Sequence, residues 1–274
     1  MVLLACTSFI SEAQTDSTQA QADSTSKFKF KIGVYYNNYL NYYGRTDNLH
    51  SSGFFPMAEL WFKRKFYVNA APIFTNNSVS GTQYAGTVTT AGYLINRKKS
   101  STHIYLVKPI YKDNSQLVQS ALKAQLAASF TKLTRAINFT MGADVKFSGS
   151  TDYGANAGLD HIFRKQFPGK YVLVIDPSFY VYAGTQQYTQ TRYEKNGFLI
   201  FPGVEKEITE EVKKFNLLSF EASVPVIVAK GNWMLLATPS FVIPQNLAAI
   251  PERPDLSESG KAMFYITAGV KLSL

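Results

Sequence analysis

The last eleven residues of the chain alternate strictly between two kinds of side chain. In residues 264–274 every even position is apolar, and the odd positions include Tyr265, Thr267 and Lys271. A period of two predicts a β-strand with one apolar and one polar face, because successive side chains of a strand point to opposite sides. A tilted strand of about 9–11 residues also crosses the hydrocarbon core of a bilayer. This segment constrains the fold more than any other part of the chain.

The same alternation recurs from residue 27 onward. Clear examples are residues 28–34, 56–62, 66–74, 137–147, 171–181, 218–226 and 233–243. With the weaker segments 87–95, 105–111 and 118–130 included, the sequence predicts about twelve strands. Charged residues make up only 17% of the chain, against roughly 25% in a typical soluble protein. No run approaches the ~18 apolar residues that a membrane helix needs.

The predicted connections differ in length. Residues 63–65 and 229–232 are tight turns, whereas longer loops are expected at 45–53, 76–86, 149–156 and 187–214. Within the last of these, Val204, Ile208 and Val212 recur every fourth residue, with Glu residues early and Lys residues late. That order favours a short helix over residues 202–214, which we expect to narrow a barrel mouth.

These features resemble the transmembrane β-barrels of Gram-negative outer membranes, and the Tyr/Asn-rich strands are similar to outer-membrane proteins of Bacteroidota. The resemblance implies an all-β fold, a transmembrane antiparallel up-and-down β-barrel of about 12 strands with both termini periplasmic. It also implies contact with outer-membrane lipids and lipopolysaccharide. Leu274 departs from the pattern, since such barrels usually end in an aromatic residue. A soluble sandwich would show the same alternation, but the export-like N-terminus and the aromatic residues near strand ends favour the membrane.

The sequence divides into three parts. Residues 1–13 are predicted to be a truncated signal peptide, 14–26 a disordered periplasmic leader, and 27–274 the barrel. An alternative takes residues 3–6 as a lipobox, in which Cys6 would be lipid-modified. Cys6 is the only cysteine, so neither a disulfide framework nor a thiolate metal site is expected.

In a barrel of this kind the polar strand faces line the interior. The candidate pore-lining residues are Lys29, Lys31, Glu59, Lys108, Lys123, Asp144, Lys146, Asp176, Tyr180, Tyr182, Glu221 and Lys271. In residues 105–111 we expect Tyr105 and Tyr111 to face lipid and Lys108 to face inward. Barrels of ~8 strands are filled by side chains and those of 16–18 strands are open, so about twelve allows either a filled interior or a narrow hydrated pore.

Two functions follow from these alternatives. A passive, porin-like channel for small solutes is expected, with an anion preference because lysines exceed acids in the predicted lining. The alternative is a non-conducting barrel that acts as a scaffold or as the membrane subunit of a larger complex with protein partners. The net charge of +9 lies largely in predicted turns. No nucleic-acid motif accompanies it, so no nucleic-acid partner is expected.

Enzymatic chemistry is not expected. The chain has three histidines, His50, His103 and His161, and the spacing of none indicates a nucleophile and its base. No cofactor motif or metal-ligand spacing is visible.

Overall fold

The computed structural model describes residues 28–46, 49–112, 122–195, 205–247 and 260–274, without the side chains of 186–195 and 205–213. The predicted signal peptide (1–13) and leader (14–26) lie outside these ranges and stay predictions. Within these ranges the structure contains no helix that is long and apolar enough to span a membrane.

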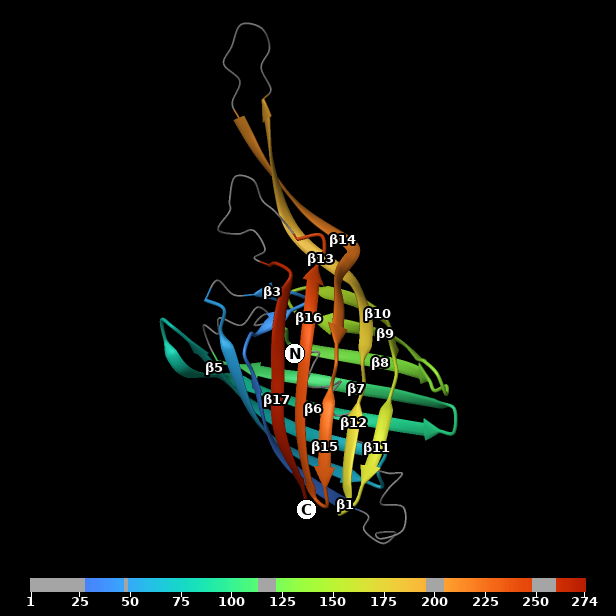
Figure 1. Ribbon diagram of the computed structural model, residues 1–274. Coiled ribbons are helices and arrows are strands. Elements are labelled where there is room, and N and C mark those ends of the chain that lie inside the picture. The colour runs from blue at the N-terminus through green and yellow to red at the C-terminus, as the bar shows by residue number, and fades with distance from the viewer. Residues whose placement is uncertain (1–27, 47–48, 113–121, 196–204, 248–259) are drawn as a thin grey trace, which may run out of the picture.

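The described residues form β-strands (Figure 1). Their bounds are β1 (Phe28–Asn37), β2 (Asn41–Tyr42), β3 (Arg45–Thr46), β4 (Ser52–Phe62), β5 (Phe66–Asn77), β6 (Gly81–Arg97), β7 (Ser100–Tyr111), β8 (Ala124–Lys132), β9 (Asn138–Phe147), β10 (Thr151–Asp160), β11 (Phe163–Phe167), β12 (Tyr171–Ile175), β13 (Ser178–Lys195), β14 (Glu205–Ser223), β15 (Val226–Lys230), β16 (Trp233–Pro244) and β17 (Met263–Ser273).

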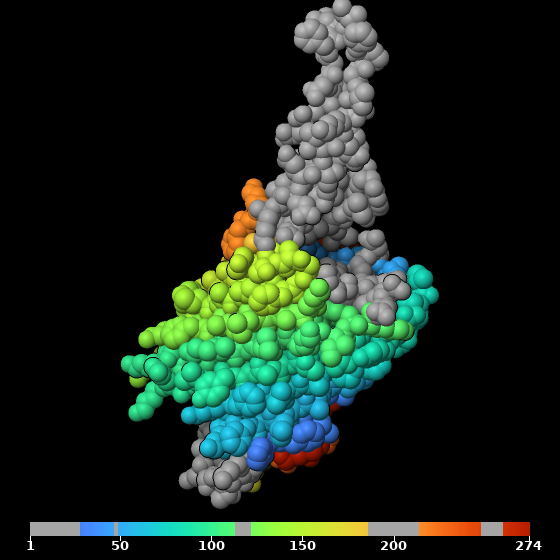
Figure 2. Space-filling view, turned by 180° about the vertical axis from the view of Figure 1, so that it is seen from behind, coloured from blue at the N-terminus to red at the C-terminus, as the bar shows by residue number. Residues whose placement is uncertain are grey.

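The main sheet closes on itself. Neighbours in sequence pair antiparallel, and β1 pairs with β17 from Lys31↔Ser273 to Asn37↔Thr267, while β17 also pairs with β16. Because β10 continues into β11, β12 into β13 and β14 into β15, the described strands make twelve walls. The space-filling view from behind shows the same order, with the colour passing from blue through green to yellow-green across one continuous wall (Figure 2). The predicted antiparallel up-and-down barrel of about 12 strands is confirmed.

Two of the three interrupted walls break at a proline. Pro177 separates β12 from β13, and Pro225 separates β14 from β15. Proline has no backbone N–H for the ladder. The neighbouring strands still connect across the breaks, because His161 N donates to Pro177 O (3.1 Å) and Asp176 N donates to Pro225 O (3.0 Å).

The barrel is apolar on its outside and polar on its inside. Large apolar side chains are exposed at alternate positions of nearly every wall, including Ile32, Leu60, Leu126, Leu235 and Phe264. A soluble protein rarely leaves so continuous an apolar surface in water. In a bilayer the same surface faces hydrocarbon, and the closed sheet satisfies its backbone groups internally. The fold is therefore that of a transmembrane β-barrel.

The two ends of the barrel differ. At one end lie the start of β1, the C-terminus and the short turns (Figure 1). The links at this turn end are 63–65, 98–99, 133–137, 168–170 and 231–232. The links at the opposite end, here called the mouth, are 38–51, 78–80, 112–123, 148–150, 196–204 and 245–262.

Four expectations about the mouth links were wrong, one of them the long loop at 187–214, of which residues 187–195 and 205–214 belong to strands. Much of residues 76–86 and 149–156 belongs to strands, which leaves only the short links 78–80 and 148–150. The predicted helix over 202–214 is absent from its described part, because residues 205–214 belong to β14, which pairs with β13 up to Lys195↔Glu205. The apolar residues at every fourth position did not produce a helix, because the backbone pairing between β13 and β14 continues through this segment.

The expected orientation of β7 was also wrong. Ile104, Leu106 and Ile110 are exposed on its outer face, so Lys108 lies on that face too, whereas His103 and Val107 are buried inside. Through Val107 the inner face of β7 joins a buried apolar cluster on β1, β4, β5 and β6, namely Tyr35, Phe55, Met57, Ala71, Ile73, Ala85 and Val88. Long basic side chains on an outer face can reach the polar edge of a bilayer with their amines.

Inward tyrosines pack flat on glycines of the adjacent strand. The ring of Tyr67 in β5 lies over Gly92 in β6, and that of Tyr180 in β13 lies over Gly158 in β10. A Cβ at either glycine would occupy the position of the ring. These contacts fix the direction in which the bulky inner side chains lean.

Replacing Gly92 with alanine should destabilise the barrel, because the new Cβ overlaps the ring of Tyr67. Overpacking of this kind costs about 1–3 kcal/mol of unfolding free energy, measurable by urea unfolding in lipid vesicles. The control is Gly149→Ala in the 148–150 turn, where a Cβ meets no atom within 4 Å. An equal loss in both variants would contradict the proposed contact.

Candidate functional site: the barrel interior and its mouth

Ten of the twelve candidate residues lie on the inner face of a strand or of the wall that continues it. Lys29, Lys31, Glu59, Asp144, Lys146, Asp176, Tyr180, Tyr182, Glu221 and Lys271 are buried or half-buried there. Lys108 is on the outer face, and Lys123 is exposed just before β8, at the mouth. Whether the inner set lines a conducting pore stays a prediction.

Three charged candidates meet in the half of the barrel nearer the turn end. The Nζ of Lys271 in β17 lies 2.8 Å from Oε1 of Glu59 in β4, and the Nζ of Lys31 in β1 lies 3.8 Å from the same oxygen. All three residues are at most 4% exposed. The closure of β1 on β17 creates this cluster, because it brings residues 31 and 271 to neighbouring walls. One carboxylate thus balances part of the charge of two buried ammonium groups.

A row of stacked rings continues from this cluster. Lys31 Nζ lies 4.9 Å from the ring centroid of Trp61, and Trp61 stacks on Tyr67 at 4.7 Å. Tyr67 in turn stacks on His103 at 5.7 Å, with a hydrogen bond of 3.0 Å between Oη and Nε2. His103 stacks on Tyr105 at 4.5 Å. Ring faces are arranged along β4, β5 and β7 as a continuous aromatic surface.

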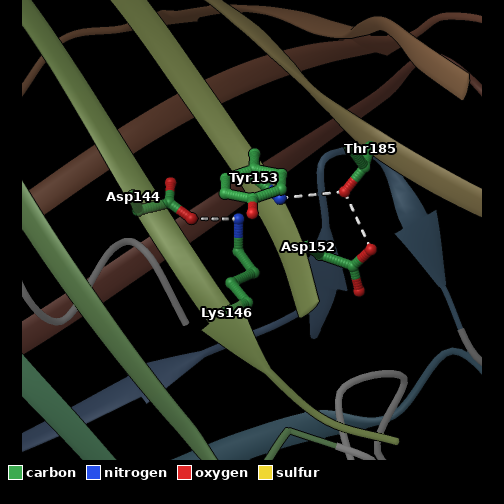
Figure 3. Close-up of polar contacts among 5 residues, drawn as sticks. All are labelled: Asp144, Lys146, Asp152, Tyr153 and Thr185. Atoms are coloured by element: carbon green, nitrogen blue, oxygen red, sulfur yellow. Dashed lines mark hydrogen bonds and ion pairs between the residues drawn. The ribbon is translucent and has the colours of Figure 1, made fainter. Parts of the chain in front are cut away.

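A second polar network lies on β9, β10 and β13, near the mouth (Figure 3). Lys146 forms an ion pair with Asp144 two residues earlier on the same face. Thr185 donates its hydroxyl to Asp152 Oδ1 at 2.8 Å and accepts from the backbone N–H of Tyr153 at 2.9 Å. Figure 3 shows the Asp144–Lys146 pair on β9 beside the contacts that Thr185 of β13 makes with Asp152 and with the Tyr153 backbone of β10.

The link between β1 and β4 folds back as a small hairpin, here called the mouth hairpin (residues 41–46). Its strands β2 and β3 pair as Asn41↔Thr46 and Tyr42↔Arg45. The two turn residues, Tyr43 and Gly44, have φ of 55° and 77°, the combination of a tight type I′ turn. Asn41 Oδ1 accepts from Gly44 N at 3.2 Å and stabilises the turn.

The mouth hairpin reaches walls far from its own. Tyr43 contacts Tyr182 of β13 with ring centroids 5.0 Å apart, and Lys146 of β9 lies 5.9 Å from the Tyr43 ring. β9 is five walls away from β4. Arg45 donates to Leu218 O and Gln245 O, both at 3.2 Å. The mouth hairpin therefore extends across the mouth.

Burial stabilises the mouth hairpin in this position. Tyr43 and Arg45 are both less than 9% exposed. Burial raises the pKa of the Tyr43 hydroxyl well above its ordinary value, so the ring stays neutral beside Lys146. A neutral, buried tyrosine and a guanidinium that donates to three backbone carbonyls hold this hairpin in the mouth.

Several inner polar atoms on another stretch of wall have no hydrogen-bond partner among the described residues. They are Asp176 Oδ1 between β12 and β13, Ser219 Oγ in β14, and Thr238 Oγ1 and Ser240 Oγ in β16. Buried polar groups of this kind are normally satisfied. Chemically, the wall offers hydroxyl and carboxylate oxygens to water or to a polar solute. Within the described residues no three His, Cys, Asp or Glu side chains come together to hold a metal ion.

Sequence reasoning missed the mouth hairpin and the stacked row. A signal for the hairpin existed, since Asn41 and Gly44 bracket two tyrosines in a pattern typical of tight turns. From the sequence, no role was assigned to His103, which is buried in β7. Its inward position depends on the orientation of β7, which the sequence did not determine.

Comparison with known proteins finds similarity to solved structures at a low level. No family model matches the chain, and no curated protein matches it. The solved structures that match include the KdgM porin (TM-score 0.45, 11% identity, covering 89% of this chain and 99% of that one). Others are the COG4313 outer membrane channel from Pseudomonas putida F1 (0.44, 12%, 93% and 98%) and LpxR from Salmonella typhimurium (0.37, 10%, 89% and 99%). At these values the likeness assigns no solute, partner or reaction to this chain.

Replacing Glu59 with glutamine should destabilise the barrel more than replacing Lys31 with glutamine. Loss of Glu59 leaves two buried ammonium groups without their carboxylate, at about 3–5 kcal/mol of unfolding free energy. Loss of Lys31 leaves the shorter Lys271–Glu59 pair of 2.8 Å in place. Urea unfolding of both variants in lipid vesicles gives the comparison, and the reverse order would show that Glu59 is not the centre of this cluster.

Proposed function

We propose that the chain is a barrel of a Gram-negative outer membrane, with both termini in the periplasm, and that small hydrated solutes pass through its interior. The observation that carries this proposal is the inner wall at Asp176, Ser219, Thr238 and Ser240, whose side-chain oxygens have no hydrogen-bond partner among the residues that the structure describes. Such atoms in an interior surrounded by lipid require water or a polar solute as partners. In a non-conducting barrel whose interior is filled by side chains, we would expect these oxygens to be hydrogen-bonded to other side chains.

The orientation follows from link length. In outer-membrane barrels short turns face the periplasm and longer connections face outward. The turn end holds the start of β1 and the C-terminus, so both described ends of the chain are assigned to the periplasm and the mouth hairpin to the outer surface.

The mouth hairpin is the proposed constriction. It takes the role that the sequence had suggested for residues 202–214. Arg45 and Tyr43 hold it against β13, β14 and β9, and its loss would widen the entrance without removing any barrel strand.

The anion preference was expected because lysines outnumbered acids in the predicted lining, and the structure removes that excess. The inner faces of the described residues carry five cations, Lys29, Lys31, Arg45, Lys146 and Lys271, and six carboxylates, Glu59, Asp144, Asp152, Asp160, Asp176 and Glu221. With Lys108 outside, the lysines no longer exceed the acids. We therefore expect weak ion selectivity.

A non-conducting barrel that supports a protein complex is the second candidate. The stacked row and the cluster around Glu59 favour it, because they fill part of the interior with buried side chains. Conductance separates the two functions.

Replacing Gly44 with alanine should increase the conductance of single channels in planar bilayers. A Cβ at Gly44 would lie 2.8 Å from Pro244 Cδ, which pushes the mouth hairpin away from β16. The matched control is Gly81→Ala, where φ is also positive (61°) but a Cβ meets nothing within 4 Å. The wild type and the control should show the same small, discrete conductance. Absence of channels in all three proteins would overturn the channel and favour the scaffold.

A further inference from the structure

The turn end of the barrel is strongly basic. Each of its five short links holds or adjoins at least one cation, and the twelve are Lys63, Arg64, Lys65, Arg97, Lys98, Lys99, Lys132, Arg135, Arg164, Lys165, Lys170 and Lys230. No Asp or Glu occurs in the segments 62–66, 96–100, 131–138, 163–171 and 229–233. All twelve cations are exposed except the half-buried Arg164.

Three of these lysines project from the outer side of the barrel wall. Lys132 in β8, Lys165 in β11 and Lys230 in β15 continue the exposed alternation of their strands. Lys132 lies directly across from Phe139, and Lys165 from Leu173. Directly opposed side chains on one face of a sheet are neighbours, so each ammonium group adjoins the apolar surface that faces lipid.

Lys230 shows the arrangement in most detail. It pairs across the sheet with Tyr171 on one side and Trp233 on the other, and both rings are exposed. Its Nζ lies 4.3 Å from the Tyr171 ring centroid and donates to Tyr171 Oη at 2.6 Å. Lys165 is stacked in the same way, 5.1 Å from the Phe167 ring. These contacts hold the cations beside the aromatic side chains that mark the edge of the hydrocarbon.

We propose that these outward lysines, here called the basic belt (Lys132, Lys165 and Lys230), bind the phosphate groups of anionic phospholipids in the leaflet at the turn end. A cation on the outer wall, beside rings at the hydrocarbon edge, faces lipid headgroups, whereas a protein partner beneath the barrel would meet the turns themselves. This inference rests on the membrane placement proposed above. The turn cations add a positive potential that attracts anionic headgroups to the same rim.

The test uses the full chain with Trp61→Phe, which leaves Trp233 as the only tryptophan next to Lys230. The protein is reconstituted in vesicles of phosphatidylcholine with brominated acyl chains, which quench Trp233. Unbrominated phosphatidylglycerol or unbrominated phosphatidylcholine is then added in increasing fraction, and the recovery of fluorescence gives the relative affinity of the two lipids for this site. We expect phosphatidylglycerol to displace the brominated lipid about five times more effectively.

Two variants sharpen the measurement. Lys230→Gln should bring the relative affinity close to that of phosphatidylcholine, whereas Lys108→Gln, an equal charge change on the outer face near the mouth, should leave it unchanged. Equal displacement by both lipids in the parent protein, or an unchanged preference in Lys230→Gln, would overturn the basic belt. If brominated phosphatidylcholine failed to quench Trp233 at all, the membrane placement itself would be wrong, so the two failures are distinguishable.

Discussion

Closure of the backbone ladder between β1 and β17 is the constraint on which the rest of the structure depends. A sheet in hydrocarbon cannot leave an edge of unpaired N–H and C=O groups, because each costs several kcal/mol there. The pairing from Lys31↔Ser273 to Asn37↔Thr267 removes both edges. Once the sheet is closed, one face of every strand is outside and the other inside, and the apolar and polar positions are sorted accordingly. The prolines between wall segments are tolerated because neighbouring groups bond across the breaks.

The polar interior is a consequence of that sorting, and its stability depends on local pairing. Glu59 lies between two lysines that closure brings together. At the mouth, Arg45 donates to the carbonyls of Leu218 and Gln245, near the points where β14 and β16 separate. The same fold thus uses ion pairs near the turn end and a buried hairpin at the mouth. The proposed passage of hydrated solutes rests on a third stretch of inner wall, whose oxygens have no hydrogen-bond partner within the described part of the chain.

The number of strands and most of their faces could be predicted from sequence, because charged residues mark the inner side of strands such as β1 and β9. The prediction of strand faces failed where few charged residues indicated the inner side. On β7 both faces are apolar, so the single charge of Lys108 was a misleading guide. On β6 the segment 87–95 alternates regularly in burial, but its pattern in the sequence was weak because Thr occurs on both faces, with Ala on one and Gly on the other. The contact of Lys31 with Glu59 and Lys271 depends on closure across the whole chain, and the position of the mouth hairpin depends on walls far away in sequence. Neither is encoded in a local pattern.

The two tryptophans test the inside and outside of the barrel most directly. Trp233 is 57% exposed on the outer face and Trp61 is 2% exposed on the inner face. In vesicles of phosphatidylcholine brominated close to the headgroup end of its chains, the Trp61→Phe variant, which retains Trp233, should be strongly quenched. The Trp233→Phe variant, which retains Trp61, should be quenched little. Strong quenching of Trp61, or none of Trp233, would contradict a closed barrel with its apolar face toward lipid.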